Sequence, residues 1–161
     1  MIEIRPCTPE DADALWDILH PIFSAGETYA MPRDINREDA LAFWVEPPNV
    51  AFVAEIDGAV VGSYFIRPNK KGGGSHVCNC GYATGEAARG NGVARAMRTH
   101  SLDHARATGY AAMQFNFVVA TNTRAIAIWE AHGFDTVGRL PDAFRHPTEG
   151  EVDALVMFRR L

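Results

Sequence analysis

The chain has 161 residues, of which 47% are hydrophobic and 22% are charged, and its formal net charge is -5. This length suits one domain over residues 1–161, long enough to bury a core, and the composition is that of an ordinary globular protein. The negative net charge argues against general affinity for nucleic acid or for an anionic membrane surface.

The first half of the chain predicts a strand, two helices and a hairpin. Thr8 supplies a capping hydroxyl, followed by a proline and two acids, which is typical of a helix start. Asp57-Gly58 is a strong hairpin turn signal. In chain order we expect a strand at 2–5, a helix from Thr8-Pro9-Glu10-Asp11 onward, a helix at about 36–45, and strands at 50–56 and 59–66.

The second half predicts strands that alternate with helices. In order we expect a strand at 76–84, a helix from Gly92 to near Gly109, a strand at 112–119, a helix at 122–132, and strands at 134–140 and 152–159. This order predicts an α/β (α+β) fold with a mixed central sheet of about seven strands and helices on both faces.

A glycine-containing turn, Ala88-Arg89-Gly90-Asn91-Gly92-Val93-Ala94-Arg95, joins the strand at 76–84 to the following helix. A helix start presents unpaired N–H groups and the positive end of the helix dipole, which together suit phosphate oxygens. Gly90 and Gly92 let a ligand approach the backbone closely. The turn matches neither a Walker loop nor a dinucleotide-binding fingerprint. Taken alone, it could equally be an ordinary strand-to-helix turn.

Two motifs in this half resemble the signatures of the GNAT superfamily of N-acetyltransferases. Arg89-x-x-Gly92-x-Ala94 resembles its pyrophosphate-binding motif, and Asn122-x-x-Ala125-x-x-x-Trp129-x-x-x-Gly133-Phe134 resembles its second signature. The order of strands and helices also matches the GNAT fold along nearly the whole chain. The resemblance implies an enzyme that uses acetyl-CoA as co-substrate, without a metal. It implies cofactor-binding roles for Thr84, Arg89, Gly90, Asn91, Gly92, Val93, Ala94, Arg95, Asn122 and Trp129.

Trp129 departs from the family pattern. Many members have at this position a tyrosine that protonates the departing thiolate, whereas an indole N–H is only a hydrogen-bond donor. Either another group protonates the sulfur, or the thiolate leaves unaided, which the thiol pKa near ~8.5 makes tolerable. Alternatively, Trp129 is simply a core aromatic residue.

Three asparagines are candidates for the catalytic centre. In the GNAT fold, two neighbouring parallel strands diverge there, and the corresponding strands here are 76–84 and 112–119. Asn79 and Asn116 lie on these strands, and Asn122 begins the second motif. An asparagine inside an apolar strand is costly unless it is hydrogen-bonded, so the three amides are expected to converge where the strands part. The alternative is that they satisfy only backbone groups.

His76-x-Cys78-x-Cys80 places three metal-ligating residue types on one face of a strand. No fourth ligand is evident and the spacing is not that of common zinc sites, so we expect small buried cysteines and no metal. The chain has three cysteines, which make no disulfide framework, and it has neither a signal-peptide pattern nor an apolar run of membrane-spanning length. We therefore predict a cytoplasmic location.

The acceptor side of the fold is formed by the loop between the first two helices and by the loop between the last two strands. The candidates for acceptor binding in these loops are Glu27, Tyr29, Phe144, Arg145 and His146. Arg145 suits an acceptor carboxylate and Glu27 an ammonium group; a plain surface loop is the alternative. Short stretches at 26–29, 115–119 and 144–147 resemble a GNAT branch that includes fungal enzymes acetylating proline analogues such as azetidine-2-carboxylate.

The leading hypothesis is direct transfer of the acetyl group from acetyl-CoA to the amine of a small molecule, implied to be amino-acid-like. A protein acetyltransferase acting on a lysine or an N-terminus is the second enzymatic hypothesis. A non-catalytic acyl-CoA-binding sensor is the third, motivated by Trp129 in place of tyrosine. The family also offers homodimerisation through the last strands, and no nucleic-acid or membrane partner is expected.

Overall fold

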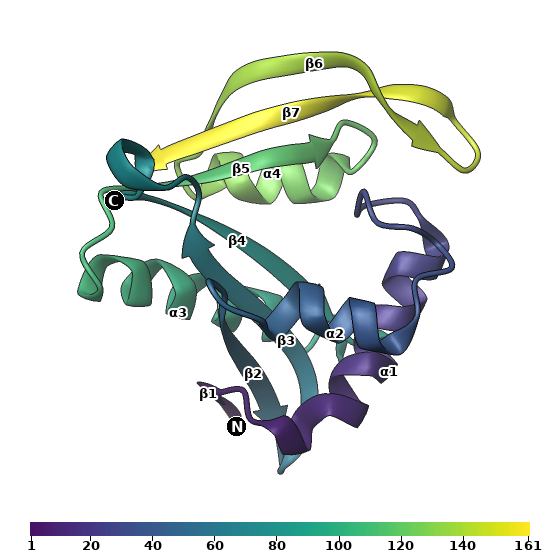
Figure 1. The fold of residues 1–161 in the computed structure, drawn as a ribbon, viewed down its shortest axis with the longest axis vertical. Coiled ribbons are helices and arrows are strands. Elements are labelled where there is room, and N and C mark those ends of the chain that lie inside the picture. Colours follow the sequence, from purple (N-terminus) through teal and green to yellow (C-terminus); the bar gives the residue numbers. More distant parts are fainter.

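A single seven-stranded sheet runs through the protein in the order β1-β2-β3-β4-β5-β7-β6. The computed structural model describes all residues from Met1 to Leu161 (Figure 1). All neighbouring strands are antiparallel except β4 and β5, so the sheet is mixed. The strands are β1 (Ile2–Pro6), β2 (Val50–Ile56), β3 (Ala59–Pro68), β4 (Val77–Thr84), β5 (Ala112–Val119), β6 (Asp135–His146) and β7 (Gly150–Arg160). The predicted fold class is thus confirmed.

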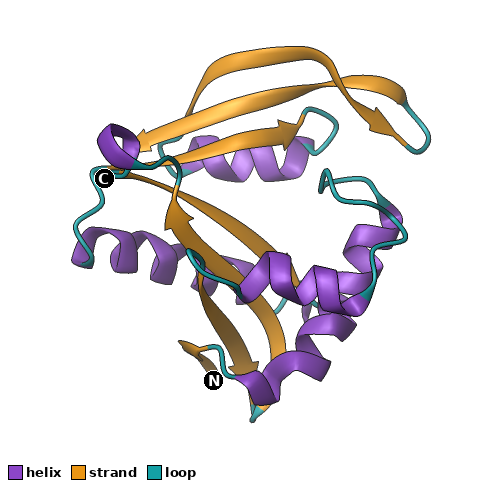
Figure 2. Cartoon of the chain, in the orientation of Figure 1, coloured by secondary structure: helices purple, strands orange, loops and turns teal.

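Helices cover both faces of this sheet (Figure 2). On one face α1 (Ala12–Ala25) and α2 (Arg37–Val45) bury a core against Val53, Phe65 and Ala83. On the other face α3 (Val93–Ala107) and α4 (Thr123–Ala131) close the larger core. Short 3-10 turns lie at Pro9–Asp11, Gly72–Gly74 and Glu86–Ala88. No helix is both long and apolar enough to cross a membrane.

The start of α1 is fixed by an ion cluster. Asp11 caps the turn through the Thr8 N–H and accepts two hydrogen bonds from the Arg5 guanidinium, each 2.8 Å long. Arg5 also pairs with Glu55 on β2, which joins the first strand, the helix start and the sheet. The Arg5 hydrogen bonds lower the pKa of the Asp11 carboxyl from 3.8 to about 2. This carboxylate is therefore ionised at all ordinary pH values.

The strands β4 and β5 are paired only at their beginning. Val77 lies opposite Ala112 and Cys78 opposite Met113, and after these two pairs the strands diverge, as Figure 1 shows. Farther along, β5 is irregular between Phe115 and Val118, where its pairing with β7 shifts. The result is a gap in the middle of the sheet, which opens a passage between its two faces.

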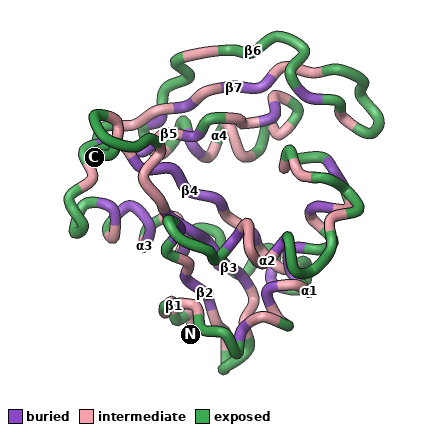
Figure 3. The backbone as a smooth tube through the Cα atoms, viewed as in Figure 1, coloured by how far each residue is buried: buried purple, intermediate pink, exposed green.

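The hairpin of β6 and β7 is longer than expected. The sequence predicts a loop between strands at 134–140 and 152–159, but β6 continues to His146 and the turn is confined to the following residues. The pairing of β6 with β7 shifts at a bulge between Leu140 and Phe144, where Asp142 has a φ angle of 51°. The pairing then resumes with Phe144 opposite Val152. The bulge was not evident in the sequence, because the residues around it are typical of a loop although β6 continues beyond them. Figure 3 shows β6 exposed along most of its length.

Candidate active site

A cavity of about 610 Å³ passes through the gap between β4 and β5. We call the part walled by α3 and α4 the donor half. It is lined by Arg89, Ala94, Arg98, Asn122, Arg124, Ala125, Ile128 and Trp129. We call the part walled by α1, α2 and the loop between them the acceptor half. It is lined by Ile22, Thr28, Tyr29, Ala30, Met31, Phe43, Phe65, Arg67, Asn79 and Asn116.

The donor half ends at the N-terminus of α3, which no side chain caps. The first bond of the helix runs from the Ala96 N–H to the Gly92 carbonyl, so the three preceding N–H groups, of Val93, Ala94 and Arg95, have no partner. Gly90 and Gly92 adopt left-handed φ angles of 85° and 81°, which favour glycine. Free N–H groups, the helix dipole and the neighbouring Arg89 make this turn suitable for a diphosphate.

The ten cofactor-binding candidates occupy different positions around this turn. Thr84, Arg89, Ala94, Asn122 and Trp129 line the cavity. Gly90 and Asn91 are exposed on the turn itself. The side chain of Val93 is buried in the core, so Val93 offers a ligand only its N–H. Gly92 and Arg95 line a separate hollow on the outer side of α3, together with Ala96, Thr99, His100 and Asp103.

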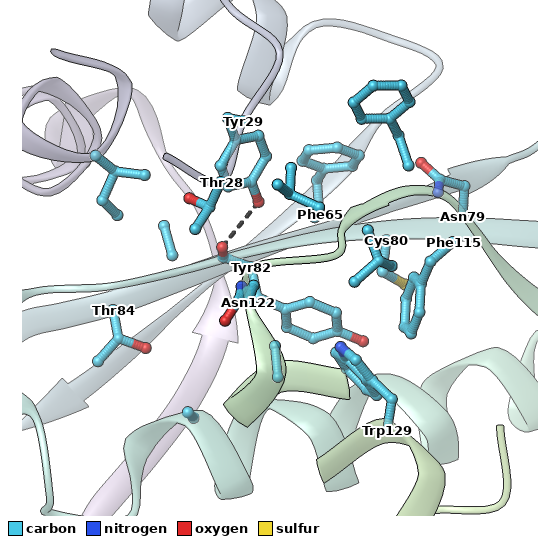
Figure 4. Close-up of a pocket in the computed structure, with 18 of the residues that line it drawn as sticks. Thr28, Tyr29, Phe65, Asn79, Cys80, Tyr82, Thr84, Phe115, Asn122 and Trp129 are labelled. Carbon is cyan, nitrogen blue, oxygen red and sulfur yellow. Dashed lines mark hydrogen bonds between the residues drawn. The ribbon is translucent and has the colours of Figure 1, made fainter. Parts of the chain in front are cut away.

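Trp129 is held in an aromatic cluster below the gap (Figure 4). Its ring centroid lies 4.2 Å from that of Phe115 and 5.3 Å from that of Tyr82. The Arg98 guanidinium lies 5.9 Å from the centre of the indole ring, and its Nε atom is buried without a hydrogen-bond partner. Burial lowers the pKa of Arg98. Arg98 also lines the cavity, although the motifs did not identify it; it lies one helical turn beyond Ala94.

The backbone of β4 presents unpaired groups to the gap. Val77 accepts a bond from the Asn69 N–H on the β3 side, whereas His76 accepts one from the Ala111 N–H on the β5 side. By strand alternation, the N–H groups of Cys80 and Tyr82 therefore point toward β5, beyond the last pair of residues that joins the two strands. Such N–H groups can polarise a carbonyl oxygen placed in the gap.

Tyr29 reaches this gap from the acceptor side. Its hydroxyl donates a hydrogen bond of 2.8 Å to the Tyr82 carbonyl, shown as the dashed line in Figure 4. Burial raises the pKa of the Tyr29 hydroxyl, so the group is a neutral donor at physiological pH. Tyr29 is thus an acceptor-side candidate that the structure brings into the cavity.

The three asparagines line the same cavity but have different partners. The Asn79 amide donates to the Gln114 carbonyl at 2.9 Å and so bridges the strands where they begin to part. The exposed Asn116 side chain donates to the Asn69 Oδ1 at 2.6 Å. Asn122, at the start of α4, makes no side-chain capping bond. Its amide therefore remains available to a ligand, and the catalytic roles of all three stay predictions.

The acceptor half is aromatic and carries a single charged side chain. Phe65 packs edge-on against Phe43 and Trp44 of α2, and Arg67 is the only charged residue among those that line this half. No Asp, Glu, His or Lys lines any part of the cavity. Burial raises the pKa values of the Cys80 thiol and the Tyr82 hydroxyl, which also line it. The cavity thus has no group suited to accept a proton near neutral pH.

The remaining acceptor candidates lie outside the lining of the cavity. Glu27 is exposed on its loop. Arg145 is exposed and pairs with Glu151 across the β6–β7 hairpin at 3.1 Å. Phe144 is buried, with its ring 6.1 Å from that of Phe117, and it reaches the cavity only through this contact. His146 accepts bonds from the N–H groups of the hairpin turn and lies beside Phe144.

The residues of the His76-x-Cys78-x-Cys80 motif do not form a cluster of metal ligands. Cys78 and Cys80 are buried in the core beneath α3. No group of three or more His, Cys, Asp or Glu side chains in the structure is arranged to hold a metal ion. Both thiols therefore act as small apolar groups in the packing of this face.

Comparison with known proteins gives consistent matches. The acetyltransferase (GNAT) family model matches residues 12–134. N-acetyltransferase aca1 of Schizosaccharomyces pombe is 31% identical over 149 residues, which cover 81% of this chain and 71% of that protein. A GCN5-related N-acetyltransferase from Kribbella flavida superposes with a TM-score of 0.94 at 40% identity, covering 99% of this chain and 98% of that one. The yncA acetyltransferase structure from Salmonella typhimurium, with its cofactor acetyl-CoA, superposes with a TM-score of 0.85 at 19% identity, covering 100% and 94%.

Proposed function

The chain belongs to the GNAT family of acetyltransferases and depends on acetyl-CoA, and we propose that its acceptor is the amine of a small, amino-acid-like molecule. The observation that carries this proposal is the size of the cavity, together with the aromatic lining of its acceptor half. Donor and acceptor share about 610 Å³, a volume typical of small-molecule sites. The acceptor half is walled by α1, the following loop, α2 and β3, and together with the donor half it leaves room for a compact acceptor. The cytoplasmic location and the homodimer stay predictions.

The donor half fits acetyl-CoA. Three free N–H groups at the start of α3, together with Arg89, would hold the diphosphate. Asn122 and Trp129 on α4 would lie along the pantetheine arm. When bound, acetyl-CoA would supply the activated acetyl group, and CoA would leave as the thiolate when the C–S bond of the thioester breaks. The free N–H groups of Cys80 and Tyr82 would polarise the thioester carbonyl.

Proton transfer in this site depends little on the protein. Trp129 cannot protonate a thiolate, and no carboxylate or histidine lines the cavity to receive the amine proton. The acceptor must therefore react as the free amine, and the proton released on C–N bond formation passes to water. Arg98, whose guanidinium lies 5.9 Å from the centre of the Trp129 ring, would add a positive charge to the side of the cavity from which the thiolate would leave. A thiolate is stable enough near neutral pH to leave with this electrostatic help alone.

Two other hypotheses followed from the sequence. Membership of an acetyltransferase family favours an enzyme over a non-catalytic acyl-CoA sensor. A protein acetyltransferase remains the alternative, and it requires a groove that accepts an extended peptide on both sides of the reactive amine. The aromatic acceptor half, with Arg67 as its one charged side chain, favours a small molecule instead.

The test is release of the CoA thiol from acetyl-CoA with a panel of amines. The panel contains free amino acids, proline analogues, polyamines, aminoglycosides and lysine-containing peptides. We expect turnover with one or more free amino acids or their analogues. Turnover confined to peptides, with binding of acetyl-CoA intact, would replace our proposal with protein acetylation.

A further inference from the structure

Arg67 stands near the end of β3, on the sheet face that α1 and α2 cover. Ser63 and Phe65, at the preceding alternate positions, contact Trp44 of α2, so Arg67 points to the same side. Its register partner on β4 is Asn79, which also lines the acceptor half. Arg67 therefore belongs to the acceptor half and lies on the opposite face of the sheet from α3.

The Arg67 guanidinium has no anionic partner in the protein. It lies 5.4 Å from the centre of the Phe65 ring, and it takes part in none of the ion pairs or hydrogen bonds of the structure. Every other arginine that lines the cavity (Arg89, Arg98 and Arg124) belongs to the donor half. The acceptor half therefore carries one uncompensated positive charge on an aromatic wall.

This charge constrains the acceptor. An acceptor that carries only ammonium groups would bring positive charge next to Arg67, with no carboxylate in the cavity to offset it. An acceptor with its own carboxylate would pair with the guanidinium, whose planar fork matches two carboxylate oxygens. The surrounding side chains of Met31, Phe43 and Phe65 offer hydrophobic contact but no hydrogen-bonding group.

We propose that Arg67 is the specificity-determining residue that binds the acceptor carboxylate, and that the acceptor is an amino acid with an apolar side chain. This inference rests on the proposed small-molecule function and names the class of acceptor. Asn79 and Asn116 flank the bound carboxylate, and the aromatic wall holds the side chain. Polyamines and aminoglycosides, which lack a carboxylate, are poor acceptors.

The test compares free amino acids with their carboxamides, using leucine, phenylalanine, proline and azetidine-2-carboxylate. Rates are expressed per unprotonated amine, because removal of the carboxylate charge changes the amine pKa. For the wild-type enzyme we expect kcat/KM to favour the acid by about 10- to 100-fold, the range of a charge-assisted hydrogen bond. In Arg67→Met this preference should fall to about 1, mainly through a higher acceptor KM. Arg67→Lys keeps the charge but loses the fork, so it should restore part of the preference.

Controls separate the possible failures. Arg106→Met, on the exposed surface of α3, should keep the wild-type preference. The Kd for acetyl-CoA should be unchanged in Arg67→Met, because the residue lies outside the donor half. If acids and carboxamides react equally well in the wild-type enzyme, the role of Arg67 is wrong while the small-molecule function stands. If Arg145→Met abolishes the preference and Arg67→Met does not, the carboxylate binds at the hairpin instead. If no free amine reacts and peptides do, the proposed function itself fails.

Discussion

Substitution of Gly81 by alanine should disturb the packing of the acceptor half, and it should affect other parts of the molecule less. An added Cβ would lie 2.4 Å from Cε1 and 2.7 Å from Cζ of Phe65. Carbon atoms in contact prefer about 3.5–4.0 Å, so the ring must retreat by about 1 Å. Phe65 is only 2% exposed and packs against Trp44 with ring centroids 4.9 Å apart, so it has little space into which to move.

We expect Gly81→Ala to lower the free energy of unfolding by about 1–3 kcal/mol, the usual cost of overpacking a core. For a chain of this size this corresponds to a fall in Tm of about 2–12 °C. Because Arg67 rests on the Phe65 ring, the same shift should reduce kcat/KM for the acceptor by about 10-fold or more. The Kd for acetyl-CoA should change little, because the strain falls on the acceptor face.

Differential scanning calorimetry and steady-state kinetics with the best acceptor test this prediction. Gly138→Ala on β6 is the matched control, because its added Cβ would lie 3.6 Å from the Val156 Cβ, an ordinary contact. This control should keep the wild-type kinetics and have a Tm that is equal or slightly higher. Wild-type stability and acceptor KM in Gly81→Ala would show that the contact with Phe65 does not shape the acceptor half.

Three further predictions concern the cofactor, proton transfer and stability. Gly92→Asp should abolish acetyl-CoA binding measured by calorimetry, because it adds negative charge and a side chain at φ 81°. Gly109→Asp, at φ 89° on the far end of α3, should retain binding, and an equal loss in both variants would indicate backbone strain alone. The kcat/KM should rise about 10-fold per pH unit up to the pKa of the acceptor amine, because the acceptor reacts as the free amine. The cavity should add no titration near neutral pH, because burial raises the pKa of groups such as Cys80. A limb of the pH profile between about pH 6 and 9 that does not move with the acceptor would contradict this. Asp11→Asn should cost about 2 kcal/mol of unfolding free energy or less at pH 6, because the Arg5 hydrogen bonds lower the Asp11 pKa from 3.8 to about 2. That contribution is present above the unfolded pKa and is lost as pH falls toward 2, so urea unfolding curves of variant and wild type should converge in acid; a constant gap would refute the linkage.

The order of strands and helices could be predicted from the sequence because its signals are local. The Asp57-Gly58 turn, the capping residues around Thr8 and the glycines at 109 and 133 act within a few residues. The strand-to-helix turn was equally readable, because left-handed φ angles at Gly90 and Gly92 need glycine whatever surrounds them. The bulge in β6 escaped prediction because the strand resumes only through its pairing with β7.

The composition of the cavity could not be read from the chain, because its walls come from segments far apart in the sequence. Arg145 was the natural candidate for a carboxylate partner, yet it pairs with Glu151 on an exposed hairpin. Arg67, the unpaired arginine of the acceptor half, sits in a strand where nothing in the sequence distinguishes it from a solvated charge. Arg98 likewise became part of the site only when α3 packed beside Trp129.

The sequence by itself thus determined the order of the elements, the phosphate-type turn and the family, because each depends on short-range conformational preference or on motifs within single segments. Only the tertiary structure decided which charges face the cavity and which are neutralised elsewhere. The divergence of β4 from β5 is the physical reason, because it opens one passage through the sheet and brings β3, the loop after α1, α3 and α4 to its walls.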